Sequence, residues 1–395
     1  MTKWHLISIG DCCEIVSGST PKTTKKSFWD GDILWVTPKD LSQLEGKFIS
    51  ETSRKITEEG LESCAASLLP VDSVLFSSRA PIGHVAINKK PMATNQGFKS
   101  LIPKRAMVDP NFLYYWLRGN REYLESLGNG ATFKELSKSV FSKVKIPLPP
   151  LEEQRRIADI LDRADALRRL RRESLARLDE LTRSIFLDMF GDPATNPKGW
   201  PVRNFASLLR VSLRNGLSPS HGGKVIGKVL TLSAITGDRF DDTAWKESTF
   251  VSIPPLEQSV DAQDFLICRG NGNLHLVGRG YFPLKTMKNI TFPDTMIAAK
   301  MNEMLAEKGY IQNIWSTDYI RGQIERFART TNGTYKINQG MIEKILIPLP
   351  PLPLQQEFAR RVEAVERLKD GQREHLARLD ELFASLQHRA FRGEL

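Results

Sequence analysis

The segment LARLDEL occurs twice in the chain, at Leu175–Leu181 and at Leu376–Leu382, with a shift of 201 residues (the repeat shift) between the copies. Seven identical residues at such a distance indicate an internal duplication rather than an effect of composition. The same shift aligns KIPLPPL at Lys145–Leu151 with LIPLPPL at Leu346–Leu352, and no gap is needed between these segments and LARLDEL. We therefore interpret the sequence as a tandem repeat in which a globular block and a helix alternate.

The segments that contain LARLDEL are expected to form two long helices. Each follows a proline-rich stretch, and proline disfavours the helical conformation of the residue before it. Gly191 and Pro193 are expected to end the first helix. Apolar residues recur at heptad-like spacing, which is typical of paired helices. They are Ile157, Ile160, Ala164, Leu167, Leu178, Leu181 and Ile185 in the first segment, and Phe358, Val365, Leu368, Leu379, Leu382 and Leu386 in the second.

Two antiparallel helices that form a coiled coil are the simplest arrangement for such segments, because a globular block is folded between them. Polar residues interrupt the pattern midway, at Arg171 and Ser174 and again at Gln372 and His375, which predicts a polar centre. At 1.5 Å per residue the pair would extend about 55 Å and hold the blocks at opposite ends. The predicted fold class is α+β, with two pseudo-repeated α/β blocks (1–151 and 193–351) separated by two helical segments (152–192 and 352–395).

The charge of the chain is distributed unevenly. The net charge is +10 and the isoelectric point is near 9.4. Residues 152–190 contain nine basic and nine acidic groups, and residues 352–395 contain eight of each. An excess of +5 in residues 1–151 and of +5 in residues 191–351 therefore accounts for the whole net charge. A basic excess repeated in both blocks favours an anionic partner over a generic basic surface.

The sequence contains few signs of a membrane, a secreted or a metal-binding protein. No apolar run approaches the roughly 18 residues of a membrane span, and the first residues are too polar for a signal peptide. The cysteines, Cys12, Cys13, Cys64 and Cys268, form no C-x-x-C pair. We therefore expect reduced thiols in a cytoplasmic protein without a metal site.

Sequence signatures of catalysis are also missing. The chain has no Walker-type loop, no Asn/Asp-Pro-Pro-Tyr/Phe motif and no carboxylate pair at a telling spacing. The segment RGNGNLHLVGRG at Arg269–Gly280 has closely spaced glycines, but it lacks the helix and acidic residue that follow a cofactor loop. These observations favour a non-catalytic protein. The basic blocks are consistent with a protein that binds DNA. The alternative is a scaffold that carries two protein-binding domains on a coiled coil.

Several segments resemble a known family. SGSTPKTTKKSFWDGDILWVTPKDL (Ser17–Leu41), VLFSSRAPIGHVAI (Val74–Ile87) and ATNQGFKSLIP (Ala93–Pro103) are similar to the target-recognition domain of type I restriction–modification specificity subunits. IPLPPLEEQRRIADIL (Ile146–Leu161) resembles the conserved helical region that follows such a domain. The second block departs from this pattern, because it lacks the Gly-x-Thr-Pro and Trp-x-Gly-Asp motifs.

The resemblance implies a non-catalytic subunit that reads a bipartite, gapped and asymmetric site in double-stranded DNA, one half-site per block. It implies two adenine-N6 methyltransferase subunits as partners, which bring S-adenosylmethionine. It also implies, optionally, two motor–nuclease subunits that use ATP and Mg. No cofactor is expected on this chain itself, and no membrane partner.

In the first block, the candidate DNA-binding residues lie in short segments next to predicted strands. The basic loop PKTTKKS suits phosphate contacts, although a solvated loop would have the same sequence. Arg79 follows a strand and suits guanine, with a structural ion pair as the alternative. Gln96 has an amide that suits adenine, although a buried amide that caps a turn would look the same. The candidates are Lys22, Thr23, Lys25, Lys26, Arg79, Gln96 and Lys134.

In the second block, the candidates lie in RGNGNLH, RTTNG and GTYK. Glycine allows the backbone to approach a ligand closely, although it also serves simply to form a turn. ATFK at Ala131–Lys134 and GTYK at Gly333–Lys336 occur at matching places, so their lysines are expected to contact the DNA backbone rather than bases. The candidates are Arg269, Asn271, Asn273, His275, Arg329, Asn332 and Lys336.

Overall fold

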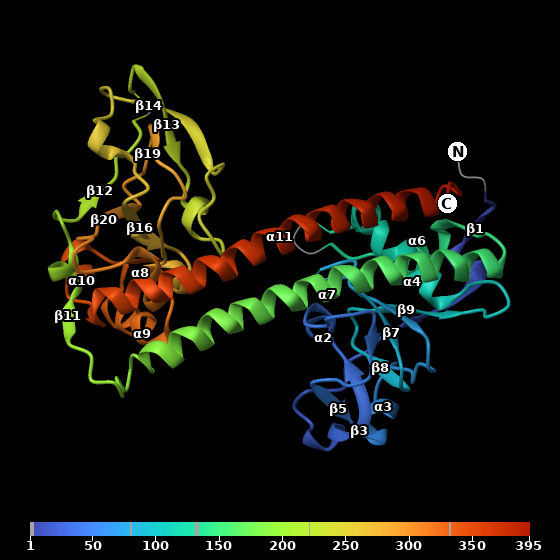
Figure 1. Cartoon of the computed structure of the whole chain (residues 1–395). Coiled ribbons are helices and arrows are strands. Elements are labelled where there is room, and N and C mark those ends of the chain that lie inside the picture. Colours follow the sequence, from blue (N-terminus) through green and yellow to red (C-terminus); the bar gives the residue numbers. More distant parts are fainter. Residues whose placement is uncertain (1–3, 80, 131–133, 221, 332) are drawn as a thin grey trace. The chain divides into compact units, whose positions relative to one another are not determined.

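The computed structural model describes residues 4–79, 81–130, 134–220, 222–331 and 333–395 (Figure 1). The chain divides into two compact units, Met1–Glu173 with Arg373–Leu395 (unit 1) and Ser174–Gln372 (unit 2). The two long helices, α7 (Leu151–Phe190) and α11 (Leu352–Ala390), each contribute to both units. Each unit therefore combines one globular block with one part of each long helix.

Two sheets form the block of unit 1. The first has the order β2-β9-β6-β7-β4, and the second has the order β5-β3-β8. The pairs β2–β9, β9–β6 and β6–β7 are antiparallel, whereas β7–β4 and β3–β8 are parallel. The strands are β2 (Cys13–Ser17), β3 (Trp29–Val36), β4 (Phe48–Ile49), β5 (Arg54–Ile56), β6 (Val74–Phe76), β7 (Val85–Asn88), β8 (Met92–Thr94) and β9 (Lys99–Pro103), and β1 (Leu6–Ser8) pairs separately with β10 (Lys145–Pro147).

Short helices cover these sheets. They are α1 (Ile9–Cys12), α2 (Pro38–Ser42), α3 (Glu58–Glu62), α4 (Pro110–Gly119), α5 (Arg121–Ser126) and α6 (Lys138–Lys143). Asp109 caps α4 by accepting hydrogen bonds from the backbone N–H groups of Asn111 and Phe112. Tyr115 of α4 is buried in a core that also includes Ile157 of α7 and Phe383 of α11. The long helices are therefore part of the core of the unit rather than appendages to it.

Unit 2 repeats the plan of unit 1. One sheet has the order β12-β20-β16-β18 and the other β14-β13-β19-β15, with β13 and β19 parallel. β12, β20, β16 and β18 thus match β2, β9, β6 and β7, which confirms the duplication. The strands are β12 (Arg214–Asn215), β13 (Val225–Leu230), β14 (Trp245–Phe250), β15 (Ser259–Val260), β16 (Asp264–Cys268), β18 (Gly280–Tyr281), β19 (Met287–Thr291) and β20 (Met296–Lys300), and β11 (Val202–Asn204) pairs with β23 (Leu346–Pro348).

A third, three-stranded sheet occurs in unit 2. It consists of β17 (Gly270–Asn271), β22 (Thr334–Lys336) and β21 (Arg329–Thr331), in that order. The helices of the block are α8 (Lys308–Trp315), α9 (Asp318–Phe327) and α10 (Gln339–Glu343), with 3-10 turns at η2 (Phe205–Leu208), η3 (Leu232–Ile235), η4 (Leu256–Gln258) and η5 (Leu274–Leu276); η1 (Lys26–Phe28) is in unit 1.

Equivalent glutamines tie each block to a long helix. The buried Gln154 accepts a hydrogen bond of 2.8 Å from the backbone N–H of Asp109 and donates one of 2.9 Å to the carbonyl oxygen of Met107. In unit 2, Gln355 accepts from the N–H of Glu307 at 2.9 Å and donates to the oxygen of Leu305 at 3.1 Å. The repeat shift therefore matches residues with the same role.

The helix pair differs in one respect from the pattern predicted by heptad spacing. Ala164 and Phe358 are buried as expected. Leu167, Leu181, Leu368 and Leu382, however, are 52, 45, 59 and 48% exposed and therefore lie outside the contact between the helices. Phe383, Val362 and Phe186 are buried instead. The long helices have two apolar faces, and spacing alone selected residues from both.

Candidate nucleic-acid interface

Loops from distant parts of unit 1 meet where strands end. Backbone N–H groups of Gly18 and Ser19 donate to the carbonyl oxygens of Phe98 and Thr94 at 3.2 and 3.0 Å. The N–H of Ser78 donates to Gly97 at 2.7 Å. A Cβ atom on Gly18 would lie 1.9 Å from the oxygen of Asn95, so only glycine fits there. Backbone hydrogen bonds thus bring together residues 18–19, 36, 78, 94–98 and 136.

Two tryptophans hold the basic loop in place. The indole N–H of Trp35 donates to the carbonyl oxygen of Ser19 at 3.1 Å, and that of Trp29 donates to the oxygen of Lys22 at 3.3 Å. The two rings meet edge to face at 5.0 Å, and the guanidinium carbon of Arg54 lies 3.6 Å from the centre of the Trp29 ring. The loop therefore has a fixed path before any ligand binds.

The basic side chains of this loop differ in whether they pair with a carboxylate. Lys22, Thr23 and Lys26 are exposed, and within the described residues neither lysine has a carboxylate partner. Lys25 pairs with Glu59 at 2.5 Å and lies over the ring of Phe28 at 4.2 Å. Lys22 and Lys26 are thus better placed than Lys25 to contact a phosphate.

Arg79 has an intramolecular partner. Its guanidinium group lies 3.6 Å from the carboxylate of Glu135, which also lies 3.3 Å from the ammonium group of Lys99. The side chain of Arg79 is still 36% exposed. The ion pair predicted as an alternative is therefore present, and it orients an arginine that solvent and ligands can reach.

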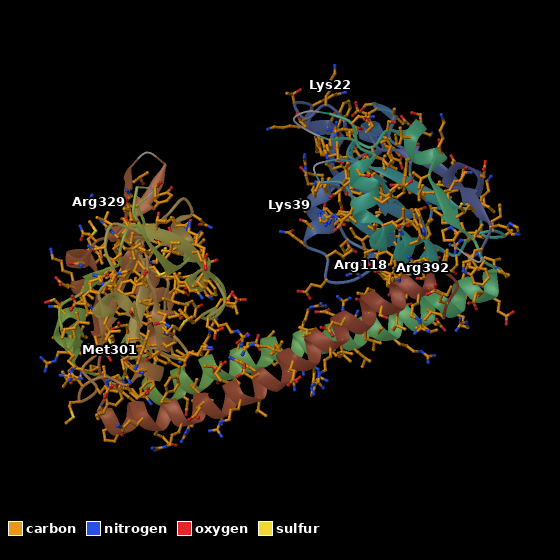
Figure 2. All side chains as sticks on the ribbon, turned by 90° about the horizontal axis from the view of Figure 1, so that it is seen from above. Lys22, Lys39, Arg118, Met301, Arg329 and Arg392 are labelled. Carbon is orange, nitrogen blue, oxygen red and sulfur yellow. The ribbon has the colours of Figure 1, made fainter. Side chains whose placement is uncertain are left out.

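Gln96 and Lys39 complete this face of unit 1. Gln96 is exposed and hydrogen-bonds to the hydroxyl of Thr20. Lys39, which sequence reasoning missed, is exposed in α2 beside Pro38, and Pro38 is 3.4 Å from a Cβ built on Gly97. Figure 2 shows Lys22 and Lys39 along one side of the block. The signal for Lys39 was its position directly after a buried strand, as for Arg79.

Asp40 fixes the segment that contains Lys39. Its carboxylate accepts hydrogen bonds from the N–H of Thr37 at 2.8 Å and the N–H of Ser53 at 2.9 Å. Burial alone would raise the pKa of Asp40, but the hydrogen bonds from Thr37 and Ser53 prevail and hold it below its usual range. Asp40 is therefore the acidic member of the capping box at the start of α2, whose N-cap residue is Thr37.

The same loop arrangement is present in unit 2. Gly216 N–H donates to Met296 at 3.1 Å, as Gly18 does to Phe98, and Arg269 N–H donates to Thr295 at 2.8 Å, as Ser78 does to Gly97. The N–H of Ile337 donates to Arg269 at 2.9 Å, as Leu136 does to Ser78.

These matching bonds fix which residues are equivalent. Gly270 takes the place of Arg79, and it pairs with Lys336 just as Arg79 pairs with Glu135. The alignment of ATFK with GTYK, which matched Lys134 with Lys336, is therefore wrong by one residue. Lys336 instead occupies the place of Glu135. The exposed Lys134 corresponds to Tyr335.

The remaining candidates of unit 2 differ in their exposure and in their hydrogen-bond partners. Asn271 and Asn273 accept hydrogen bonds from backbone N–H groups two residues ahead, at 2.9 and 3.0 Å, and so stabilise turns. His275 is 80% exposed and lies 3.6 Å from Glu325. Arg269 donates to the backbone oxygen of Asp294 at 3.2 Å and lines a pocket of about 370 Å³ with Asn215 and Gln339. Asn332 lies outside the described residues.

Charge therefore differs between the equivalent faces. Within the parts of the chain that the structure describes, Arg269, Arg329 and Lys336 have no carboxylate within 4.0 Å, whereas Arg79 has Glu135. Arg329 and Lys336 are cross-strand partners in β21 and β22. Figure 2 shows Arg329 in the part of unit 2 remote from the helices. Both faces can hold an anionic ligand, through different side chains.

Two other kinds of site are absent from the described residues. None of the helices there is long and apolar enough to span a bilayer. The described His, Cys, Asp and Glu side chains form no group of three or more that could bind a metal ion.

Comparisons with known proteins point to one family. The model of the type I restriction modification DNA specificity domain matches residues 1–180. The MjaIX specificity subunit of Methanocaldococcus jannaschii is 39% identical over 225 residues, which cover 53% of this chain and 52% of that protein. The EcoKI specificity subunit of Escherichia coli K12 is 26% identical over 378 residues, 89% of this chain and 80% of that protein. The chain thus spans about half the length of the first relative.

Solved structures support the fold. The S subunit of a type I restriction-modification system from M. genitalium has a TM-score of 0.53 at 16% identity, and the match covers 99% of this chain and 96% of that one. A chain from a study of assembly and conformational transition in the type I R-M system has a TM-score of 0.55 at 19% identity, with 99 and 98% covered.

Proposed function

We propose that this chain is a specificity subunit of a type I restriction–modification system and that it reads an interrupted, asymmetric site in double-stranded DNA. The observation that carries this proposal is the repeated loop arrangement with different side chains at equivalent places. A common framework accounts for two similar binding faces, and different side chains account for two different half-sites.

Phosphate and base contacts are assigned by charge and exposure. Lys22 and Lys26 of unit 1 and Lys336 of unit 2 are exposed cations without carboxylate partners among the described residues, which suits phosphates. Arg79 has an oriented guanidinium group and Gln96 an exposed amide, which suit guanine and adenine in the major groove.

The long helices offer repeated surfaces for partner subunits. Leu167 and Leu368 are related by the repeat shift, as are Leu181 and Leu382, and all four are 45 to 59% exposed. Exposed leucines that recur in both copies of a repeat suggest two similar docking surfaces. We assign them to two adenine-N6 methyltransferase subunits. S-adenosylmethionine would be bound by those partners, and ATP and Mg by motor–nuclease subunits, so that this chain is itself non-catalytic.

The helices would also set the gap between the half-sites. One heptad inserted into both α7 and α11 should lengthen the gap while both half-sites keep their sequence, because the blocks are unchanged. A gap that does not change would refute this role.

A map of N6-methyladenine in the source genome, with and without this gene, tests the proposal. We expect a two-part motif with a gap that disappears on deletion. Unchanged methylation, in cells where the methyltransferase is active, would favour a scaffold that does not bind DNA.

A further inference from the structure

Unit 2 contains a cavity of about 1150 Å³. It lies between α8 and the long helices, and its lining includes Asn313 and Ser316 from the α8 region, Thr182 of α7, and Glu363 and Glu366 of α11. Seven acidic and four basic residues line it, so its charge is net negative. Aromatic side chains such as Phe186 and Phe282 provide an apolar part of the wall.

The internal repeat shows what fills the same place in unit 1. Helices α4 and α8 are aligned by their caps, Asp109 and Glu307, each of which bonds to the equivalent glutamine of a long helix. Counting from these caps, Tyr115 corresponds to Asn313 and Arg118 to Ser316. The repeat shift relates Phe383 of unit 1 to Thr182 in the same way.

The side chains of unit 1 close this space. The rings of Tyr115 and Phe383 are 6.1 Å apart, and the guanidinium carbon of Arg118 is 6.0 Å from the centre of the Phe383 ring. In unit 2, Asn313, Ser316 and Thr182 are smaller and each hydrogen-bonds to a backbone oxygen of its own segment. The cavity is therefore the space that an aromatic side chain, an arginine and a second aromatic side chain occupy in unit 1.

The carboxylates at this place also differ in their partners. In unit 1, Asp162 accepts hydrogen bonds of 2.6 Å from the hydroxyl of Tyr115 and from the ammonium group of Lys47. Its equivalent, Glu363, lines the cavity and pairs with Arg367 of its own helix at 3.1 Å, with the carboxylate side chain 66% exposed.

The next carboxylate along each helix shows a similar contrast. Asp165 lies 3.4 Å from the guanidinium group of Arg118, which comes from the globular block. Its equivalent, Glu366, also lines the cavity and pairs with Lys369 of the same helix at 2.6 Å. In unit 1 the block thus supplies cations to both carboxylates.

We propose that the cavity of unit 2 receives a segment of a methyltransferase partner that inserts an aromatic side chain beside a lysine or arginine. The inserted aromatic group takes the place that Tyr115 fills in unit 1, and the inserted cation pairs with Glu363. This inference rests on the proposed function, since it concerns the partner assigned there. It makes the two docking surfaces unequal, because the cavity is a feature of unit 2.

Binding of the methyltransferase subunit to the full-length chain tests the inference, with native mass spectrometry for stoichiometry and calorimetry for affinity. The variant Asn313→Tyr/Ser316→Arg introduces the side chains of unit 1 and should fill the cavity. We expect it to retain one methyltransferase and to bind the second about tenfold more weakly or worse, since a lost hydrogen bond to a charged group changes affinity by that factor.

Glu363→Gln is a milder second variant, which keeps the shape of the side chain and removes its charge. It should weaken one of the two binding events about tenfold. Glu374→Gln is its matched control, because Glu374 is 64% exposed on the same helix and pairs with an arginine four residues ahead. Glu374 does not line the cavity, so binding should match the wild type.

Two outcomes would overturn the inference in different ways. If Glu363→Gln and the filled variant both bind two methyltransferases with wild-type affinity, the cavity is not a docking site. If the filled variant does not fold, Glu363→Gln decides alone. If the wild-type chain binds no methyltransferase at all, the proposed function fails, and this inference with it.

Discussion

Asp179, in the first copy of LARLDEL, forms an ion pair of 2.7 Å with Lys369 of the opposite helix, and the lysine side chain is only 5% exposed. Asp380, in the second copy, pairs in the same way with Arg168 at 2.5 Å. The repeat shift converts one pair into the other with the helices exchanged. LARLDEL thus occurs twice because each copy supplies the acid that neutralises a cation between the helices.

Removal of either acid should destabilise the protein. Asp179→Asn leaves the buried ammonium of Lys369 with Glu366 as its remaining partner in the described part of the chain, and Asp380→Asn has the equivalent effect on Arg168. We expect each substitution to lower the free energy of unfolding by about 1 kcal/mol, measured by urea denaturation. Glu180→Gln, at an exposed position beside Asp179, is the control. Equal stability of Asp179→Asn and this control would show that the pair contributes nothing.

The duplication and the two long helices could be predicted from the sequence because they depend on local pattern. Gly191 ends α7 with a φ of 77°, as the Gly-x-Pro segment predicted. The prediction that Leu167 and Leu181 lie in the contact between the helices was wrong, because the globular blocks also pack against apolar faces of these helices. Only the tertiary contacts of Phe186 and Phe383 reveal which face is inside.

The candidate interface could be predicted only where it depends on local sequence pattern. Lys22 and Arg79 were identified because basic residues next to strands are a local feature. The pairing of Arg79 with Glu135 was not, because it joins residues far apart in sequence. The hydrogen-bond register makes Lys336 equivalent to Glu135, in agreement with the repeat shift, whereas the similarity of ATFK and GTYK had matched it with Lys134.

A fragment of residues 1–192 should form a homodimer that one substitution strengthens. In such a dimer, residues 174–190 of the second copy would replace the α11 residues of unit 1, and Thr182 would stand where Phe383 packs near Tyr115. Thr182→Phe restores the aromatic side chain, so we expect the dimer Kd to fall about tenfold, measured by analytical ultracentrifugation. Ser184→Phe, on an exposed position of α7, should have no such effect. Equal Kd values for the two variants would contradict the equivalence of the helices.

The hydrogen bond of the Trp35 indole should limit how often the basic loop opens to a protease. Trp35→Phe removes the hydrogen bond to the carbonyl oxygen of Ser19 and keeps an aromatic ring. Loss of one hydrogen bond of about 1 kcal/mol should raise the rate of trypsin cleavage in PKTTKKS about fivefold under native conditions. Cleavage in unit 2 of the same molecule serves as the internal control. An unchanged rate in the loop would mean that Trp35 does not hold it.

The Asp40 cap should make a contribution to stability that depends on pH. Because hydrogen bonds lower the pKa of Asp40 in the folded state, its contribution is fully present above the unfolded value of about 4 and is lost as pH falls through the folded value. We expect Asp40→Asn to be less stable than the wild type by about 1 kcal/mol at pH 7. The difference should shrink below about pH 4. A difference that stays constant from pH 7 to pH 3, measured by urea denaturation, would be inconsistent with this cap.

Arg79 and Lys336 should have different effects on DNA recognition, although they belong to equivalent faces of the two repeats. Arg79 is oriented by Glu135 and is assigned to a base, so Arg79→Ala should relax one position of the methylated motif in one half-site. Lys336 has no carboxylate partner among the described residues and is assigned to a phosphate. Lys336→Ala should therefore weaken binding to all sequences and reduce the salt dependence of the affinity by about one phosphate contact.

Methylome sequencing and binding titrations at several salt concentrations distinguish these two effects. Glu135→Gln separates the role of the arginine from that of its orientation, because it keeps Arg79 and removes the charge that holds it. We expect partial relaxation at the position that Arg79→Ala affects, and no change in the other half-site. Relaxation in both half-sites, or a motif unchanged by Arg79→Ala, would show that the pair of Arg79 and Glu135 is structural and that bases are read by other residues of the same face.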